Sequence, residues 1–389
     1  MGFSFAVDHN GTNISARVEW RMSATYGRSD PTQQPGPATL TLSVVYPGSV
    51  YSPATFQLGD VIKVTVSNTG QTDTIYFRGF ITGARADHET IRITCVSDVL
   101  GSLARTLIDA AAYTATNLQT VLTDVTTAAV TAGAMPGVLN APTINAMQYE
   151  VTTSAQTQVS ALSYLQQLIA SEPEGIVLEQ PGYGLIINGY DNRRISTLPA
   201  TQQFAYGSVT GFGWDWTVEK LSADFRNKTS VTYATGTATY ADTASVTANG
   251  PVGTTISTAL TNSTDANYMA LRTVQHGLEP GWRTSGLQLN CATLTDLQRK
   301  NLAANMRTGS YLTTPTVSSS VTTLYFVEGW TDDIGWNAAT GATRWIRTLN
   351  ISDIRNSQAA QRYLDVVSGV TWATVNGTYR WVDLEQNTI

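Results

Sequence analysis

The sequence has few charged residues and few of the side chains on which disulfide frameworks and metal sites depend. Charged residues make up 13% of the 389 residues, and only two cysteines and three histidines are present. Ordinary soluble proteins carry about twice that charged share. Cys95 and Cys291 lie in opposite halves of the chain, which excludes a dense disulfide framework. We expect both to be small buried hydrophobic residues.

Motifs that carry catalysis or hold cofactors are also missing. The sequence has no Gly-x-Ser-x-Gly, no Gly-x-x-x-x-Gly-Lys, and no His-x-x-x-His, Glu-x-x-His or Cys-x-x-Cys spacing. His9, His88 and His276 therefore suggest neither a metal nor a catalytic site. We predict a protein that is not an enzyme and that binds no cofactor or metal.

Long hydrophobic runs are absent as well. No stretch approaches the roughly 18 apolar residues of a membrane span. Residues 1–10 lack the basic start of a secretion signal, and Gly2 is followed by Ala6 where a myristoylation motif has Ser or Thr. We expect no membrane anchor.

Basic residues are missing from one long segment. No Lys or Arg occurs between Thr106 and Asn192, where seven acidic residues lie, although the whole chain has a net charge of only −6. Such an acidic segment repels a polyanion, which argues against nucleic-acid binding by this part of the chain. A solvated acidic face would have the same composition, and both interpretations stay open.

The first hundred residues predict β-strands. Thr39–Tyr46, Val61–Val66, Thr74–Ile81 and Ile91–Val96 are rich in β-branched and aromatic residues and are separated by short turns. In the last of these, Ile91, Ile93 and Cys95 would share the buried face of an antiparallel strand. A meander or small barrel follows from this spacing. Residues 27–37, with three prolines, predict a protruding loop.

The middle of the chain changes to a helical period. Asn117 can cap a helix with an apolar stripe that ends near Gly133, and a second helix spans roughly 157–170. A Pro181-Gly182 turn then joins two short strands. This pattern indicates a small α+β module.

Strand patterns return from about residue 204, with helices predicted near 263–277 and 294–307. In the second of these helices, Leu297, Leu302 and Met306 fall near one side, and Gly309 can close it. Residues 322–330 and 344–351 predict strands joined by a loop at 332–342. At the carboxyl end, Asn376-Gly377 predicts a hairpin turn that sets Trp372 opposite Trp381.

We therefore predict a β-rich α+β fold in which two tube-like β-barrel domains flank a small helix-plus-hairpin module. The expected parts are a first barrel (1–105), an acidic α+β middle module (106–200), a second barrel with helical insertions (201–371) and a carboxyl-terminal hairpin (372–389).

Aromatic residues suggest partner surfaces, because they contribute large apolar area at little cost in entropy. The interface residues predicted on this ground are Trp214, Trp216, Trp330, Trp336, Trp372 and Trp381. Asp332 and Asp333, between Trp330 and Trp336 in the predicted loop, also allow a sugar-binding or sugar-cleaving edge. A solvated turn explains the same residues more simply.

The order of these elements resembles the tail-tip hub proteins of long-tailed bacteriophages, known as baseplate hub, minor tail or tail-associated proteins and including those of siphophages. No single motif is specific, and the resemblance rests on their order along most of the chain. The segments that carry it are 59–66, 76–83 and 91–103 for a first barrel, 162–188 for the middle module, and 225–233 and 296–315 for a second barrel.

The resemblance implies a structural virion protein at the tail tip, assembled in the bacterial cytoplasm. It implies a homotrimer whose paired barrels adapt a sixfold tail tube to a threefold tip and enclose the DNA channel. Expected partners are the distal tail protein ring, the tape measure protein and receptor-binding, fibre or spike proteins, while genomic DNA passes without specific binding. Glu172, Glu174 and Glu179 are predicted to face that channel.

Two other functions remain open at this point. One is the hexameric distal tail protein, which has a single tube-like barrel. The other is a tail module that binds or cleaves host glycans.

Overall fold

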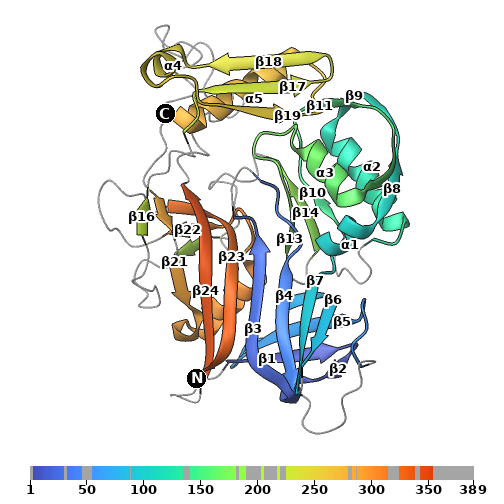
Figure 1. The fold of residues 1–389 in the computed structure, drawn as a ribbon, viewed down its shortest axis with the longest axis vertical. Helices are drawn as coiled ribbons and strands as arrows, with labels where there is room; N and C mark the ends of the chain where they lie inside the picture. Colours follow the sequence, from blue (N-terminus) through green and yellow to red (C-terminus); the bar gives the residue numbers. More distant parts are fainter. Residues whose placement is uncertain are drawn as a thin grey trace.

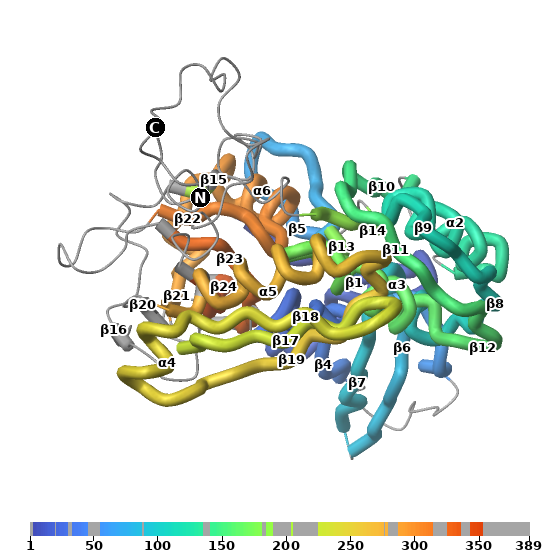
Figure 2. Tube along the Cα trace, turned by 90° about the horizontal axis from the view of Figure 1, so that it is seen from above, coloured from blue at the N-terminus to red at the C-terminus, as the bar shows by residue number. Residues whose placement is uncertain are grey.

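The computed structural model describes residues 3–29, 33–45, 55–87, 89–134, 141–180, 184–189, 203–205, 217–219, 225–278, 283–285, 287–313, 324–337 and 342–353. They form a large sheet, an α+β module beside one end of it, and a small layer of three strands and a long helix above (Figure 1). Seen from above, the small layer lies across the end of the large sheet, with the module to one side (Figure 2).

The large sheet joins strands from both ends of the described chain. Its strands are β1 (Phe3–His9), β2 (Thr12–Asn13), β3 (Val18–Gly27), β4 (Thr39–Val45), β5 (Val61–Asn68), β6 (Thr74–Ala86), β7 (Thr90–Ser97), β15 (Gln203–Ala205), β21 (Leu287–Asn290), β22 (Tyr311–Thr313), β23 (Leu324–Asn337) and β24 (Ala342–Asp353). The path runs β15-β22-β23-β3-β4-β7-β6-β5-β1-β2, with β24 on the second edge of β23 and β21 beside β24. All neighbours are antiparallel except β15 and β22.

Strand β23 is the junction of this sheet. One of its edges pairs with β3, from Gly329 opposite Gly27 to Gly335 opposite Arg21, while the other pairs with β24. Gly27 has φ +76°, and a Cβ there would lie 2.4 Å from the carbonyl oxygen of Glu328. Only glycine tolerates that approach. The strands predicted for the first barrel are thus hydrogen-bonded to those predicted for the second.

The two groups of strands also share one hydrophobic core. Its centre is aromatic: the rings of Tyr26 and Trp330 stack with centroids 5.0 Å apart, and Phe5 contacts Tyr76 and Trp345 edge to face at 5.5 and 5.3 Å. Helix α6 (Asp296–Asn305) packs against β5 and β6. The short 3-10 helices η1 (Ser15–Arg17) and η7 (Cys291–Thr293) lie beside β1 and β24.

Alternation along the strands confirms the predicted pattern. Ile91, Ile93 and Cys95 are buried, while Arg92 and Thr94 are exposed. Of the three residues predicted near one side of the helix at 294–307, Leu302 and Met306 are buried, whereas the side chain of Leu297 is 56% exposed.

Within its described residues, the module contains three helices and seven short strands, of which the last two form its hairpin. Its elements are α1 (Leu100–Arg105), β8 (Leu107–Ala110), β9 (Tyr113–Asn117), α2 (Leu118–Thr131), β10 (Thr143–Ile144), β11 (Glu150–Thr153), β12 (Gln156–Ser160), α3 (Ala161–Ile169), β13 (Ile176–Gln180) and β14 (Gly184–Asn188). As predicted, Asn117 caps α2, accepting a hydrogen bond from the backbone N–H of Gln119 at 2.9 Å. Helix α3 begins four residues later than predicted, because residues 156–160 pair with β8 instead.

The small layer has a core of its own. The layer consists of β17 (Lys228–Tyr233), β18 (Gly236–Ala241), α4 (Thr243–Asn249), β19 (Gly253–Ser257) and α5 (Ser263–Leu278). The predicted helix at 263–277 is confirmed as α5. Backbone hydrogen bonds between Thr152 and Ala259 and between Thr261 and Glu150 tie the layer to the module. A separate pair joins β16 (Thr217–Glu219) to β20 (Arg283–Ser285).

The coarse fold prediction is confirmed: the chain is β-rich, with a large curled sheet and few helices. The predicted protruding loop at 27–37 is wrong in its described part. Arg28 is buried, and Gln34 and Pro35 contact the module. The predicted loop at 332–342 is also wrong, because β23 continues to Asn337 and β24 starts at Ala342.

Candidate functional site

Hydroxyl side chains line part of the outer face of the large sheet, on the four neighbouring strands β23, β3, β4 and β7. Thr331 lies opposite Thr25, with their Oγ1 atoms 3.4 Å apart, and Thr25 lies opposite Thr39. The next outward row contains Ser23, Thr41 and Thr94. We call these side chains the hydroxyl face: Ser23, Thr25, Thr39, Thr41, Thr94 and Thr331. Since they lie on the exposed side of four neighbouring strands, they form a nearly uncharged polar surface.

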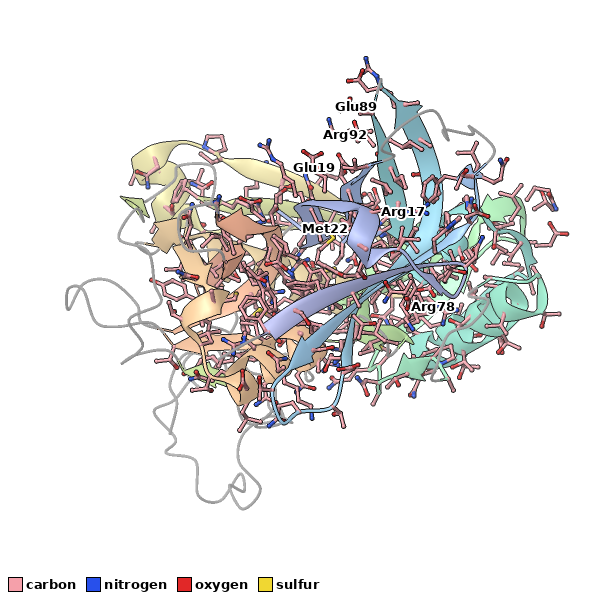
Figure 3. All side chains as sticks on the ribbon, turned by 90° about the horizontal axis from the view of Figure 1, so that it is seen from below. Arg17, Glu19, Met22, Arg78, Glu89 and Arg92 are labelled. Carbon is pink, nitrogen blue, oxygen red and sulfur yellow. The ribbon has the colours of Figure 1, made fainter. Side chains whose placement is uncertain are left out.

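Charged residues are found toward the end of this face. In register, Glu19 lies opposite Ser43, Ser43 opposite Arg92, and Arg92 opposite Arg85. Like charges directly opposite each other destabilise a strand pair, so the Arg92–Arg85 pair is unfavourable by itself. Figure 3 views this end from below and labels Glu19 on β3, and Glu89 and Arg92 on the projecting β6–β7 hairpin.

The buried side of β23 and β24 holds an ion pair. Both carboxylate oxygens of Asp332 accept hydrogen bonds from Arg347, at 2.8 and 2.7 Å, and the two side chains are 0% and 1% exposed. The Tyr76 hydroxyl donates to Asp332 Oδ2 at 2.5 Å. The Arg347 guanidinium lies 4.6 Å from the Trp330 ring centroid and 5.5 Å from that of Trp345.

This environment fixes the charge of Arg347. Burial alone would lower the pKa of Arg347, but the charge and hydrogen bonds of Asp332 outweigh it and hold the pKa above its ordinary value. Burial also raises the pKa of Tyr76, with the Asp332 charge adding to the effect. Asp332 is therefore a structural carboxylate closed off from any substrate. Asp333, its neighbour, is about half exposed and pairs with Arg344 at 2.9 Å.

A second buried pair closes the junction of β3 and β23. Arg28 donates to Glu328 Oε2 at 2.7 Å and to the Gln33 carbonyl oxygen at 2.7 Å. Ser352 donates to the other oxygen of Glu328 at 2.5 Å. Both oxygens of Glu328 thus accept hydrogen bonds, and Arg28 is paired with the carboxylate, which lowers the cost of burying the two charges.

The contact between the module and the large sheet is also polar. Glu179 on β13 accepts hydrogen bonds from the backbone N–H groups of Ala38, at 2.6 Å, and Leu100, at 3.1 Å. Burial raises the pKa of Glu179 to about 7. Burial also raises the pKa of the neighbouring Asp98 to about 6, although Arg78, 3.2 Å away, opposes the shift.

Both thiols are enclosed. Cys95 and Cys291 are 0% exposed, and burial raises the pKa of Cys95 to about 12 and that of Cys291 above its ordinary value. Within the described ranges, no group of three or more His, Cys, Asp or Glu side chains is placed to hold a metal ion. No helix in the same part of the chain is long and apolar enough to cross a membrane.

Solved structures of two tail proteins are similar to this chain. A tail protein from Neisseria meningitidis MC58 aligns with a TM-score of 0.60 over 92% of this chain and 98% of that one, at 11% identity. The 43 kDa tail protein of prophage MuSo2 from Shewanella oneidensis aligns with a TM-score of 0.56 over 91% and 98%, also at 11% identity. The chain has the fold of these two tail proteins. No family model matches the sequence, and no curated protein matches it significantly.

The predicted interface tryptophans occupy different environments. Trp330 is only 3% exposed, so its ring belongs to the core of this chain and does not form an open surface. Trp336 lies on β23, opposite Thr343, but its side chain is outside the described residues. The remaining four, Trp214, Trp216, Trp372 and Trp381, also lie outside them.

The three glutamates predicted to face a channel contact groups of their own chain. Glu172 is 4% exposed and accepts a weak hydrogen bond from the Gln148 N–H at 3.4 Å. Glu174 lies 3.5 Å from Arg272 of α5. Glu179 joins the module to the large sheet, as described above.

The sequence reasoning missed the Asp332–Arg347 pair, although the sequence contains a signal for it. A period of two places Trp330, Asp332 and Ile334 on one face of a strand. The same period places Trp345, Arg347 and Leu349 on one face of the next strand. A carboxylate and a guanidinium flanked by apolar residues on adjacent inner faces predict a buried pair.

Proposed function

We propose that this chain is a structural subunit of a phage-type tail, and that it forms the hub ring at the tail tip. The observation that carries this proposal is a shared fold with two tail proteins over more than nine-tenths of each chain. Low sequence identity is compatible with a structural role, because such a role depends on shape and packing more than on a few reactive groups.

The proposed ring is a homotrimer. Each copy contributes two tube-like units, taken to be the amino-terminal strands β1–β7 and the carboxyl-terminal strands β21–β24 of the large sheet. Three copies then present six similar surfaces to a sixfold tube, while the three identical subunits match a threefold tip. Their fusion through β3 and β23 supports this arrangement, because it holds the two units of one copy in fixed register.

The hydroxyl face is the proposed wall of the DNA channel. Tight DNA binding comes mainly from Lys and Arg side chains that displace counterions from phosphates. The hydroxyl face itself contains none, so DNA would pass without specific binding. Asp333 lies in the row of Ser23, Thr41 and Thr94, where Arg344 balances its charge.

No enzymatic activity is part of this proposal. The glycan-cleaving alternative depended on Asp332 and Asp333 acting together, and Asp332 is enclosed in its pair with Arg347. The proposed partners are the distal tail protein ring, the tape measure protein and fibre or spike proteins, in a virion assembled in the bacterial cytoplasm.

The copy number of the purified assembly tests this function. Native mass spectrometry should show three copies of the 41.8 kDa chain. Six copies would favour the distal tail protein instead, and a monomer at micromolar concentration, alone and with tube protein, would count against any ring.

A further inference from the structure

The seam between the module and the large sheet is held by a small set of side chains. Gln34 donates to the Gly175 carbonyl oxygen at 2.8 Å and accepts from the Val177 N–H at 3.1 Å. Gln166 donates to the Pro35 carbonyl oxygen at 2.9 Å, and Gln180 to that of Ala304 at 2.7 Å. Glu179 is the fourth member, and it alone among the four can gain or lose a proton.

Several elements enclose the Glu179 carboxyl group. Backbone N–H groups reach it from Ala38, at the start of β4, and from Leu100, at the start of α1. The buried Ser97 hydroxyl at the end of β7 is within hydrogen-bonding reach, and it has no other hydrogen-bond partner among the described residues. Its oxygen can accept a hydrogen bond from the carboxyl group of a neutral Glu179.

No basic side chain in the described part of the chain forms an ion pair with Glu179. The charged and titratable groups that face it are Asp98, after β7, and Tyr26, on β3. Arg78, on β6, is engaged with Asp98. A carboxylate buried beside a second carboxylate and without a cation is unfavourable, whereas a neutral carboxyl group fits the same space.

We propose that Glu179 is a protonation-dependent latch between the module and the large sheet. The seam takes up a proton when it closes, and it loosens when Glu179 ionises. The inference is independent of the proposed function, and it holds whether or not the chain forms a tail ring.

The direction of the pH effect follows from the raised pKa. With a pKa of about 7 in the closed seam and 4.5 in water, closure is favoured fully below pH 4.5, and this contribution is lost as the pH rises through 7. Between pH 5.5 and pH 8, these two values increase the opening equilibrium about 25-fold. The effect is the reverse of that for an ordinary salt-bridged carboxylate, which stabilises at high pH.

Hydrogen–deuterium exchange of the full chain tests the latch. The amides of Gln34, Gly36, Ala38 and residues 175–180 are followed at pH 5.5 and pH 8, after correction for the intrinsic exchange rates. We expect the opening equilibrium of the wild-type seam to rise about 25-fold, and that of Glu179→Gln to change less than about threefold. Glu19→Gln removes an exposed carboxylate of β3 and should behave as the wild type.

A second variant keeps the test valid if Glu179→Gln does not fold. Asp98→Asn leaves every hydrogen bond of Glu179 in place but removes the neighbouring negative charge, so the pH at which the seam loosens should fall. Equal pH dependence in the wild type and Glu179→Gln would overturn the latch. So would an unchanged midpoint in Asp98→Asn.

Discussion

The buried pair of Asp332 and Arg347 should dominate the stability of the large sheet. Its two side chains are almost fully enclosed, and they are joined by two hydrogen bonds of 2.8 and 2.7 Å. Removing one partner of such a pair costs about 3–5 kcal/mol, because the other charge is left buried without compensation. In Asp332→Ala the Tyr76 hydroxyl also loses its acceptor, which adds about 1–3 kcal/mol.

We therefore expect Asp332→Ala to lower the free energy of unfolding by about 4 kcal/mol or more. Equilibrium urea unfolding followed by tryptophan fluorescence is the suitable assay, because Trp330 and Trp345 flank the Arg347 guanidinium. The matched control is Asp333→Ala at the next residue. Its pair with Arg344 is about half exposed on both sides, so the change should stay within about 1 kcal/mol.

The double variant Asp332→Leu with Arg347→Met separates charge from packing. Replacing a whole buried pair by apolar side chains is often neutral, so the double variant should be at least about 2 kcal/mol more stable than Asp332→Ala. The reasoning is refuted if Asp332→Ala costs no more than Asp333→Ala. It also fails if the double variant loses as much stability as the two single changes together.

Three further outcomes follow from local geometry. Gly27→Ala should lower the thermal stability several times more than Gly11→Ala does. Both glycines have positive φ, but of the two only Gly27 would place a Cβ 2.4 Å from a backbone atom. Equal losses of stability would contradict the close contact. In urea unfolding, Asn117→Ala should lower the stability of the module by about 1 kcal/mol, because α2 loses its cap. Asn267→Ala, on the exposed side of α5, should leave the stability unchanged. A larger loss in Asn267→Ala than in Asn117→Ala would count against the cap. Cys95 and Cys291 should react with Ellman's reagent at least about 100-fold faster in urea than in buffer, and rapid labelling of the native chain would show that the core is open.

Local sequence patterns predicted where the strands and helices lie better than they predicted which strands pair. The strands at 39–46, 61–66, 74–81 and 91–96 and the Asn117 cap were found from the sequence, because period and capping depend on neighbouring residues. The pairing of β3 with β23 was not found, since it joins residues about 300 positions apart and no local signal names the partner.

The candidate site shows the same division. The exposed threonines of the hydroxyl face follow from alternation, but their alignment across four strands depends on register. Trp330 was predicted as an interface residue from its type, whereas its position opposite Tyr26 places it in the core. Glu179 was predicted to face a channel from the charge of its segment. Its two backbone donors come from other parts of the chain, and only the folded structure brings them together.

A cryo-electron microscopy map of the purified oligomer tests the central claim most directly. The account predicts a closed ring of three copies, in which the two halves of each large sheet occupy six similar positions and the hydroxyl face lines the central channel. A ring of six copies, or a channel lined by another surface with the two halves in unrelated positions, would contradict it.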